Sequence, residues 1–256
     1  LSAGGAPANT VPGSQTVDED APLALTGLSV ANPGALTTEV TLGVQRGTLT
    51  VDLSGGATIS GGANGSATLT LSGSEAQVNA ALSSLVYQGS AHYAGGDTLN
   101  MASSDASGQG DTSQIAITVT HVNDAPTGAP VITGTPTEDQ TLGADVSGIA
   151  DADGVGVFGY QWLRDGAAIV GATGSTYTLG DDDVGAVISV QVSYTDGQGT
   201  AESLTSATVG PIGNVNDAPT GAPVIMGTAA EGQTLGVDVS GIGDADGLGA
   251  YGYQWL

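Results

Sequence analysis

The stretch HVNDAPTGAPVITGT, residues 121–135, returns almost unchanged as NVNDAPTGAPVIMGT at residues 214–228. Asn123 and Asn216 lie 93 positions apart, and the same offset relates Trp162 to Trp255. A fixed period of this size is typical of tandem modules, each a small domain that contacts its neighbours along one axis. The repeat predicts modules at residues 1–122 and 123–215, and a truncated start of the next module at 216–256. We expect this last part to close its core only with strands from beyond residue 256 or from a neighbouring chain.

Alternating apolar and polar residues predict strands throughout the chain. The pattern is clearest in residues 48–53, 67–71, 114–120 and 187–194. A period of two places one face of each strand in a core and the other in water. The 43 glycines supply turn signals between short strands. This combination favours antiparallel β-sandwiches, so the predicted fold class is all-β.

One segment of the first module has helical spacing instead. Ser72 and Glu75 are placed as in a capping box, and Val78, Leu82 and Leu85 follow at intervals of four and three. The sequence therefore predicts a single short helix here.

The sequence FGYQWLRDG at residues 158–166 predicts an aromatic strand with Trp162 at its centre. Trp162 and Tyr160 could form a platform for stacking sugars. Alternatively, Trp162 is the core tryptophan of the third strand of an immunoglobulin-like sandwich, which is the interpretation we favour. Trp255 occupies the same repeat position, and we expect it to be a core residue too.

The charge balance is strongly acidic. The chain has 26 Asp and Glu, only two cations, Arg46 and Arg164, and a formal net charge of −24. Nucleic acid and anionic membrane surfaces repel such a chain, so neither is expected as a partner. Carboxylates without basic partners are solvated, repel one another or share a metal ion. The composition still includes 39% hydrophobic residues, enough for cores.

Several other functions are disfavoured by what the sequence lacks. It has no Cys, which excludes disulfides and thiolate metal sites, and no run of 18 apolar residues, so no membrane insertion of this segment is expected. A Ser-His or Cys-His nucleophile would depend on His92 or His121. His121 lies in a linker and His92 in a loop, and no cleft is predicted around the carboxylates. We therefore expect no enzyme.

The linker VNDAP at residues 122–126, repeated at 215–219, resembles the NDAP signature of a known family. That signature joins tandem cadherin-like and bacterial immunoglobulin-like domains in giant RTX-type adhesins, which Gram-negative bacteria export by type I secretion. The other segments similar to such repeats are residues 16–20, 74–82, 85–89, 179–185 and 194–197. The resemblance covers essentially the whole chain. It implies a cadherin-like sandwich at 1–122 and immunoglobulin-like sandwiches thereafter. It further implies an extracellular stalk at the bacterial cell surface, serving adhesion or biofilm formation, often with Ca²⁺ between adjacent repeats.

The acidic turns support calcium independently of the resemblance. Asp151 and Asp153 are one residue apart in a turn that contains Gly154. Because Ca²⁺ takes six to eight oxygen ligands, other segments must converge on such a turn. In sandwiches whose strands run end to end, the expected ligands at the first junction are Glu19, Asp97, Asn123, Asp124, Asp151, Asp153 and Asp196. Those at the second are Glu138, Asp182, Asn216, Asp217, Asp244 and Asp246.

Some features oppose a full set of ions. An isolated Asp is often a turn or cap residue, and Asp183, just before a strand, fits such a corner best. His121 and Asn214 stand where the cadherin linker opens with Asp, and Ala125 and Ala218 where it ends with Asn. At the front of the chain, residues 3–7 and 31–34 replace the linker and the acidic turn, so little metal is expected there.

The resulting interpretation is a structural extender segment of a secreted adhesin, stiffened by Ca²⁺ at its junctions. Two alternatives stay open. One is a module that binds a glycan or a protein through a sandwich face. The other is a subunit of an extracellular filament, which associates with copies of itself through exposed edge strands and strand addition. The sequence does not indicate the target of adhesion.

Overall fold

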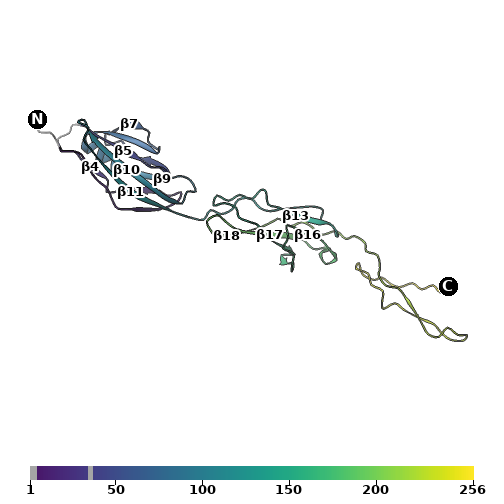
Figure 1. The fold of residues 1–256 in the computed structure, drawn as a ribbon. Helices are drawn as coiled ribbons and strands as arrows, with labels where there is room; N and C mark the ends of the chain where they lie inside the picture. Colours follow the sequence, from purple (N-terminus) through teal and green to yellow (C-terminus); the bar gives the residue numbers. More distant parts are fainter. Residues whose placement is uncertain (1–4, 34–36) are drawn as a thin grey trace. The chain divides into compact units, whose positions relative to one another are not determined.

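The computed structural model describes residues 5–33 and 37–256 and divides the chain into two compact units, Leu1–Asp124 and Ala125–Leu256 (Figure 1). Residues 3, 4 and 34 of the front segments discussed above lie outside the described residues. Residues 214–256 form part of the second unit. The further boundary at residue 215 stays a prediction.

The first unit contains three sheets and one helix. The six-stranded sheet has the order β2 (Gln15–Asp18), β11 (Gly110–Thr120), β10 (Gly95–Asp105), β5 (Thr38–Gly43), β8 (Thr68–Gly73) and β7 (Thr58–Gly62). The three-stranded sheet has the order β3 (Pro22–Ala24), β9 (Val86–Gly89) and β6 (Gly47–Thr50), and a ribbon pairs β1 (Ala8–Thr10) with β4 (Ser29–Ala31). All of these strand pairs are antiparallel except β2 and β11, which run parallel.

The core of this unit lies between the two larger sheets. Val40 and Leu42 of β5 share one buried cluster with Leu49 of β6 and Tyr87 of β9. Along β5 buried and exposed residues alternate, as the period of two predicts. The first unit is therefore a β-sandwich.

The predicted helix is present as α1 (Glu75–Leu82), with Val78 and Leu82 buried. Its capping box, however, joins Ser74 to Gln77 and not Ser72 to Glu75. Ser72 cannot cap the helix because it still belongs to strand β8. Among the described residues this helix of eight residues is the longest, and none is long and apolar enough to cross a membrane.

The second unit contains a second sandwich. One sheet has the order β12 (Val131–Thr133), β13 (Thr141–Asp145) and β16 (Thr176–Thr178). The other has the order β15 (Ala167–Ala168), β14 (Gly159–Arg164), β17 (Ile188–Thr195) and β18 (Ala201–Thr205). A 3₁₀ turn, η1 (Asp181–Asp183), precedes β17, and a ribbon of β19 (Val224–Met226) and β20 (Gly236–Asp238) follows. The predicted all-β fold of tandem sandwiches is confirmed.

Trp162 is a core residue, as expected. Its side chain is 0% exposed and stacks on Tyr177 with the ring centroids 5.7 Å apart. Its indole N–H donates a hydrogen bond of 2.9 Å to the carbonyl of Gly174. Because a buried indole needs such an acceptor, the contact fixes the ring in the sandwich.

Trp255 is 50% exposed, and its place in a core that further strands would close stays a prediction. Trp162 is covered by a cluster that includes Leu179, Val190 and Val192, and the positions 93 residues further on lie beyond Leu256.

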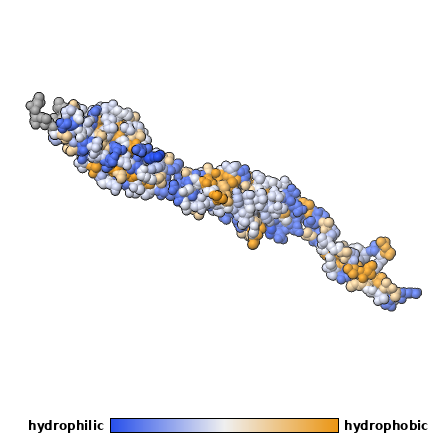
Figure 2. All heavy atoms as spheres, viewed as in Figure 1, coloured by the Kyte–Doolittle hydropathy of each residue, from blue (hydrophilic) through white to orange (hydrophobic). Residues whose placement is uncertain are grey.

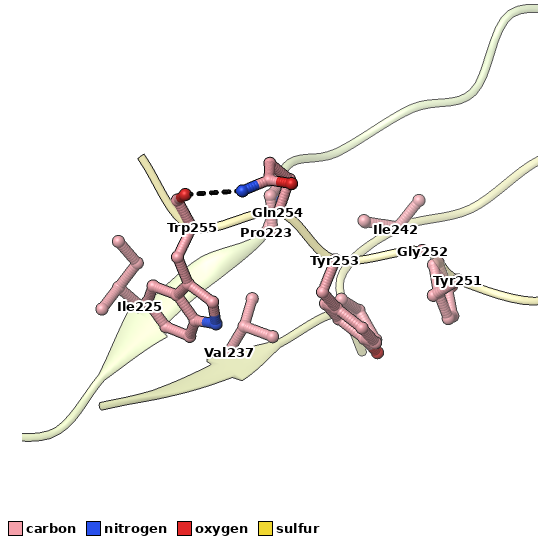
Figure 3. A pocket seen from close by; sticks show the side chains of 10 residues that line it. Pro223, Ile225, Val237, Ile242, Tyr251, Gly252, Tyr253, Gln254 and Trp255 are labelled. Carbon is pink, nitrogen blue, oxygen red and sulfur yellow. Dashed lines mark hydrogen bonds between the residues drawn. The ribbon is translucent and has the colours of Figure 1, made fainter. Parts of the chain in front are cut away.

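The uncovered residues form an apolar face. A cavity of about 330 Å³ is lined there mainly by Ile225, Val237, Ile242, Tyr253 and Trp255 (Figure 3). Figure 2 shows apolar residues at the surface of this C-terminal segment.

The two tryptophans should respond oppositely to truncation. Trp162→Ala is expected to lower the free energy of unfolding of the second unit by about 3–5 kcal/mol, the usual cost of removing a buried aromatic side chain. Trp255→Ala should change it by only about 0.5 kcal/mol, as at exposed positions. Denaturant unfolding monitored by far-UV circular dichroism measures both values. Equal destabilisation by the two substitutions would contradict the packing described above.

Candidate metal centres

A buried glutamate anchors the linker that leaves the first unit. Glu19 follows β2 and is 5% exposed. Its backbone N–H donates to Thr120, and its Oε1 accepts the N–H of Val122 at 2.7 Å. The same oxygen lies 2.9 Å from Nδ1 of His121. Glu19 thus ties the end of β11 to the first residue of the VNDAP linker.

The second unit contains the same arrangement. Glu138 is 2% exposed, donates its N–H to Gly213, and accepts the N–H of Val215 at 3.0 Å through Oε2. In each case the next residue is an aspartate with positive φ, 59° at Asp20 and 63° at Asp139. Aspartate is among the few residues that adopt this conformation at moderate cost. The two linkers are therefore held by equivalent contacts in two different sandwiches.

A mixed cluster of carboxylates and imidazole lies at the linker end of the first unit. Nδ1 of His92 is 2.8 Å from Oδ2 of Asp124 and 3.5 Å from Oδ2 of Asp20. The hydrogen bond and charge of Asp124, followed by the charges of Asp20 and Glu19, raise the pKa of His92 above its ordinary value. Asp124 was predicted as a ligand, whereas Asp20 and His92 were not.

Asp97, also predicted as a ligand, has several hydrogen-bond donors within its own unit. Its carboxylate is buried and accepts the backbone N–H groups of Gln45, Arg46 and Thr98 and the hydroxyl of Tyr87. Burial and the charge of Asp97 raise the pKa of Tyr87 well above its ordinary value. Asp97 thus fixes the turn between β5 and β6, and a role as a metal ligand stays a prediction. Asn123 lies exposed in the linker.

A cluster of three carboxylates in the second unit joins Asp151, Asp196 and Glu202, with one oxygen of each within 4.8 Å of the others. Asp151 accepts the N–H of Asp153 at 2.9 Å and the hydroxyl of Tyr194. Glu202 was missed by sequence reasoning. The signal that finds it is the register of the β17–β18 hairpin, in which Tyr194 pairs with Glu202.

Asp196 is the most informative member of this cluster. It is 7% exposed, and its Oδ1 accepts the N–H groups of Gln198 and Thr200. Oδ2 is buried and accepts no hydrogen bond from the described residues. Although burial alone would raise it, the pKa of Asp196 is lowered by backbone N–H donors, chiefly that of Thr200. The ionised form of Asp196 is favoured, and this buried carboxylate lies beside two others, Asp151 and Glu202.

The turn from Asp151 to Gly154 owes its shape to glycine. Gly154 has a φ of 93°, and its repeat equivalent Gly247 has the same value. In this turn the carbonyl of Asp153 accepts the N–H of Gly197 at 2.9 Å. The second acidic turn repeats the bond from the N–H of Asp153 to Oδ1 of Asp151: there the N–H of Asp246 donates to Oδ1 of Asp244 at 3.0 Å.

A third cluster brings together Glu138, Asp217 and Asp246, again with ligand oxygens within 4.8 Å. The N–H of Asp217 donates to Oδ2 of Asp246 at 2.7 Å. Asn216 donates its side-chain amide to the carbonyl of Asp217. These predicted residues therefore gather at the second linker.

The acidic run at η1 is divided among different roles. Asp181 interacts with the carboxyl group of Glu138. The side chain of Asp182, which was the predicted ligand, is 89% exposed. Asp183 is buried and accepts hydrogen bonds from Arg164, Tyr177 and Gly180, as expected of a corner residue. Asp181 is thus the member of the run that faces the third cluster.

Crowding of carboxylates changes their proton affinity. The N–H of Val215 lowers the pKa of Glu138, but Asp181, burial and Asp217 together raise it above its ordinary value of 4.5. Burial, and then the charges of Asp181 and Asp246, raise the pKa of Asp217 above its ordinary value of 3.8. Both shifts mean that an additional positive charge would be stabilising here.

Comparisons with known proteins add the following. No family model matches the chain, and no curated protein sequence does. Similar solved structures include EC1-2 of human mucin-like protocadherin, with 11% identity, coverage of 82% of this chain and 98% of that one, and a TM-score of 0.39. The tandem Ig repeats of Drosophila Dlar show 11% identity, coverage of 82% and 98%, and a TM-score of 0.23.

A third similar structure is the Bacteroides ovatus mixed-linkage glucan utilization protein SGBP-B in complex with a heptasaccharide. It shows 13% identity, coverage of 79% of this chain and 48% of that one, and a TM-score of 0.28. At such identities and TM-scores, these three structures assign neither a function nor a ligand to this chain.

The raised pKa of Glu138 gives a pH dependence of defined sign. Between about pH 4.5 and the higher pKa of the folded state, the carboxyl group of Glu138 is ionised in the unfolded chain and protonated in the folded chain. The free energy of unfolding therefore falls as pH rises through this range. In metal-free buffer, Glu138→Gln should flatten this fall, because Gln still accepts the N–H of Val215 through its carbonyl. Denaturant unfolding at a series of pH values measures the slope. Identical slopes in wild type and variant would show that Glu138 does not titrate as described.

Proposed function

We propose that this chain is an extender segment of an extracellular, bacterial surface or secreted adhesin, whose acidic clusters bind Ca²⁺ and stiffen the array. The observation that carries the proposal is the repeated anchoring of each VNDAP linker by a buried glutamate, with acidic clusters in the same units. An array that works by length and stiffness needs its linkers fixed. Nothing in this role requires a catalytic group.

The donor chemistry of the two clusters in the second unit favours calcium. Asp151, Asp196 and Glu202 offer carboxylate oxygens, as do Glu138, Asp217 and Asp246. Ca²⁺ is a hard cation that takes six to eight oxygens in flexible geometry, so carbonyl groups and water complete such sets. The buried Oδ2 of Asp196, which accepts no hydrogen bond from the described residues, is the atom we assign as a central ligand.

The cations of the chain do not neutralise these clusters. Arg164 pairs with Asp183 at 2.7 Å, and the guanidinium of Arg46 lies over the ring of Tyr93 at 5.4 Å. The chain contains no Lys. Bound Ca²⁺ would remove repulsion among the carboxylates and hold the acidic turns and the linkers in one arrangement. The remaining predicted ligands of the second unit, Asp153, Asn216 and Asp244, are expected to complete the sets from the linker and turns.

Asp196→Asn tests calcium binding with a minimal change. Asn keeps an oxygen for the N–H groups of Gln198 and Thr200 but replaces the unpartnered carboxylate oxygen. In chelator the variant should be slightly less stable than wild type, because a neutral amide oxygen accepts the N–H groups that lower the pKa of Asp196 more weakly than a carboxylate does. In calcium, wild type should gain about 2.7 kcal/mol at 100 times the Kd, and the variant should lose most of this gain. Thermal unfolding across a calcium titration measures both.

Asp145→Asn is the matched control, because Asp145 is exposed at the end of β13 and accepts the N–H of Ser147, which Asn can also do. It should retain the full calcium response. Small-angle scattering of wild type should show a stiffer particle in calcium than in chelator, and Asp196→Asn should reduce this difference. A calcium response of Asp196→Asn equal to that of the control would refute the assignment.

A further inference from the structure

The proposed calcium sets leave the histidines of the first unit without a role. The chain has two histidines, and each contacts a carboxylate in that unit. Ca²⁺ is coordinated by oxygen atoms and has little use for an imidazole nitrogen. Imidazole favours Zn²⁺, Cu²⁺ and Ni²⁺ instead. A nitrogen donor among carboxylates therefore points to a different class of cation.

The spacing around His92 suits a small divalent ion. Its Nδ1 is 2.8 Å from Oδ2 of Asp124 and 3.5 Å from Oδ2 of Asp20, and all three ligand atoms lie within 4.8 Å. Ligand atoms of a tetrahedral zinc ion, bound at 2.0–2.2 Å, lie roughly 3.3–3.5 Å apart. Small side-chain movements thus bring the three atoms to the distances that a zinc ion needs.

We infer that Asp20, His92 and Asp124 form a binding site for a divalent transition-metal cation, represented by Zn²⁺, with water as the remaining ligand. The site holds one nitrogen and two carboxylate oxygens. Three protein ligands and an open position are common for zinc. Binding at Nδ1 requires neutral imidazole with its proton on Nε2, so the metal replaces the proton that His92 shares with Asp124.

The backbone presents these atoms together. The N–H of His92 donates to Oδ1 of Asp20 at 3.1 Å, which leaves Oδ2 of the same carboxylate facing the ring. Asp20 has a φ of 59° and His92 a φ of 52°, a region in which Asp, Asn and His are enriched among non-glycine residues. The three ligands come from the turn after β2, the loop between β9 and β10, and the linker. A metal ion here would cross-link these segments.

His121 is a weaker candidate for the same ion. Its Nδ1 contacts Oε1 of Glu19, and this oxygen also accepts the N–H of Val122. A metal ion at that position would compete with the hydrogen bonds of the buried anchor. The site at His92 is nearly half exposed and can exchange ions with solvent without breaking that anchor.

The test uses the full chain with Zn²⁺ in excess Ca²⁺, observed through imidazole resonances by nuclear magnetic resonance and through heat by titration calorimetry. Because the chain has two histidines, the His92→Asn variant assigns both sets of resonances. We expect the His92 signals to shift and saturate at one equivalent of Zn²⁺. His92→Asn, which tolerates the same φ and lacks imidazole, should weaken zinc binding at least tenfold.

Asp20→Asn should weaken zinc binding as well, whereas Asp196→Asn should not, which separates this site from the proposed calcium cluster. His92→Asn should show the same stabilisation by calcium as wild type, because it leaves the proposed calcium ligand Asp196 unchanged. Zinc binding of undiminished affinity in His92→Asn would overturn the inference. Saturation of the His121 signals alone would overturn it too, and neither result would bear on the calcium proposal.

Discussion

The arrangement of acidic groups at the linkers depends on burying one glutamate in each sandwich. A carboxylate removed from water is costly unless it accepts hydrogen bonds. Glu19 and Glu138 meet this need with the N–H groups of Val122 and Val215, which are equivalent positions of the repeat. Each linker is thereby fixed at its first residue. The aspartates that follow in the linker are consequently held close to their own sandwich.

This placement concentrates negative charge that the two arginines of the chain do not neutralise. Arg46 and Arg164 are its only cations, and they are engaged with Tyr93 and Asp183. Among the described residues two outcomes of crowding are visible: raised pKa values at Glu138 and Asp217, and a buried Asp196 oxygen that accepts no hydrogen bond. Both are features that a bound cation would relieve. The excess of carboxylates over arginines thus perturbs particular side chains, which the net charge of the chain alone does not reveal.

Sequence reasoning was strongest where one local pattern decides the structure. Period-two alternation found the strands, and Trp162 was identified as a core residue from its strand. It failed where pairing or turn geometry decides. Glu202 joins its cluster through the β17–β18 register, and the helix cap lies at Ser74 because β8 continues through Ser72. The turn at η1 places Asp181 beside Glu138 and leaves the side chain of Asp182 exposed, so Asp182 as a ligand stays a prediction. Such contacts are not encoded in spacing along the chain.

Repetition of sequence does not imply repetition of chemistry. Among the described residues, the clusters within the second unit gather oxygen donors alone, whereas at the linker end of the first unit the nitrogen of His92 joins two carboxylates. Donor type, more than the number of carboxylates, determines which cation each cluster selects. A common framework of buried glutamates can therefore carry metal sites of different selectivity along one array.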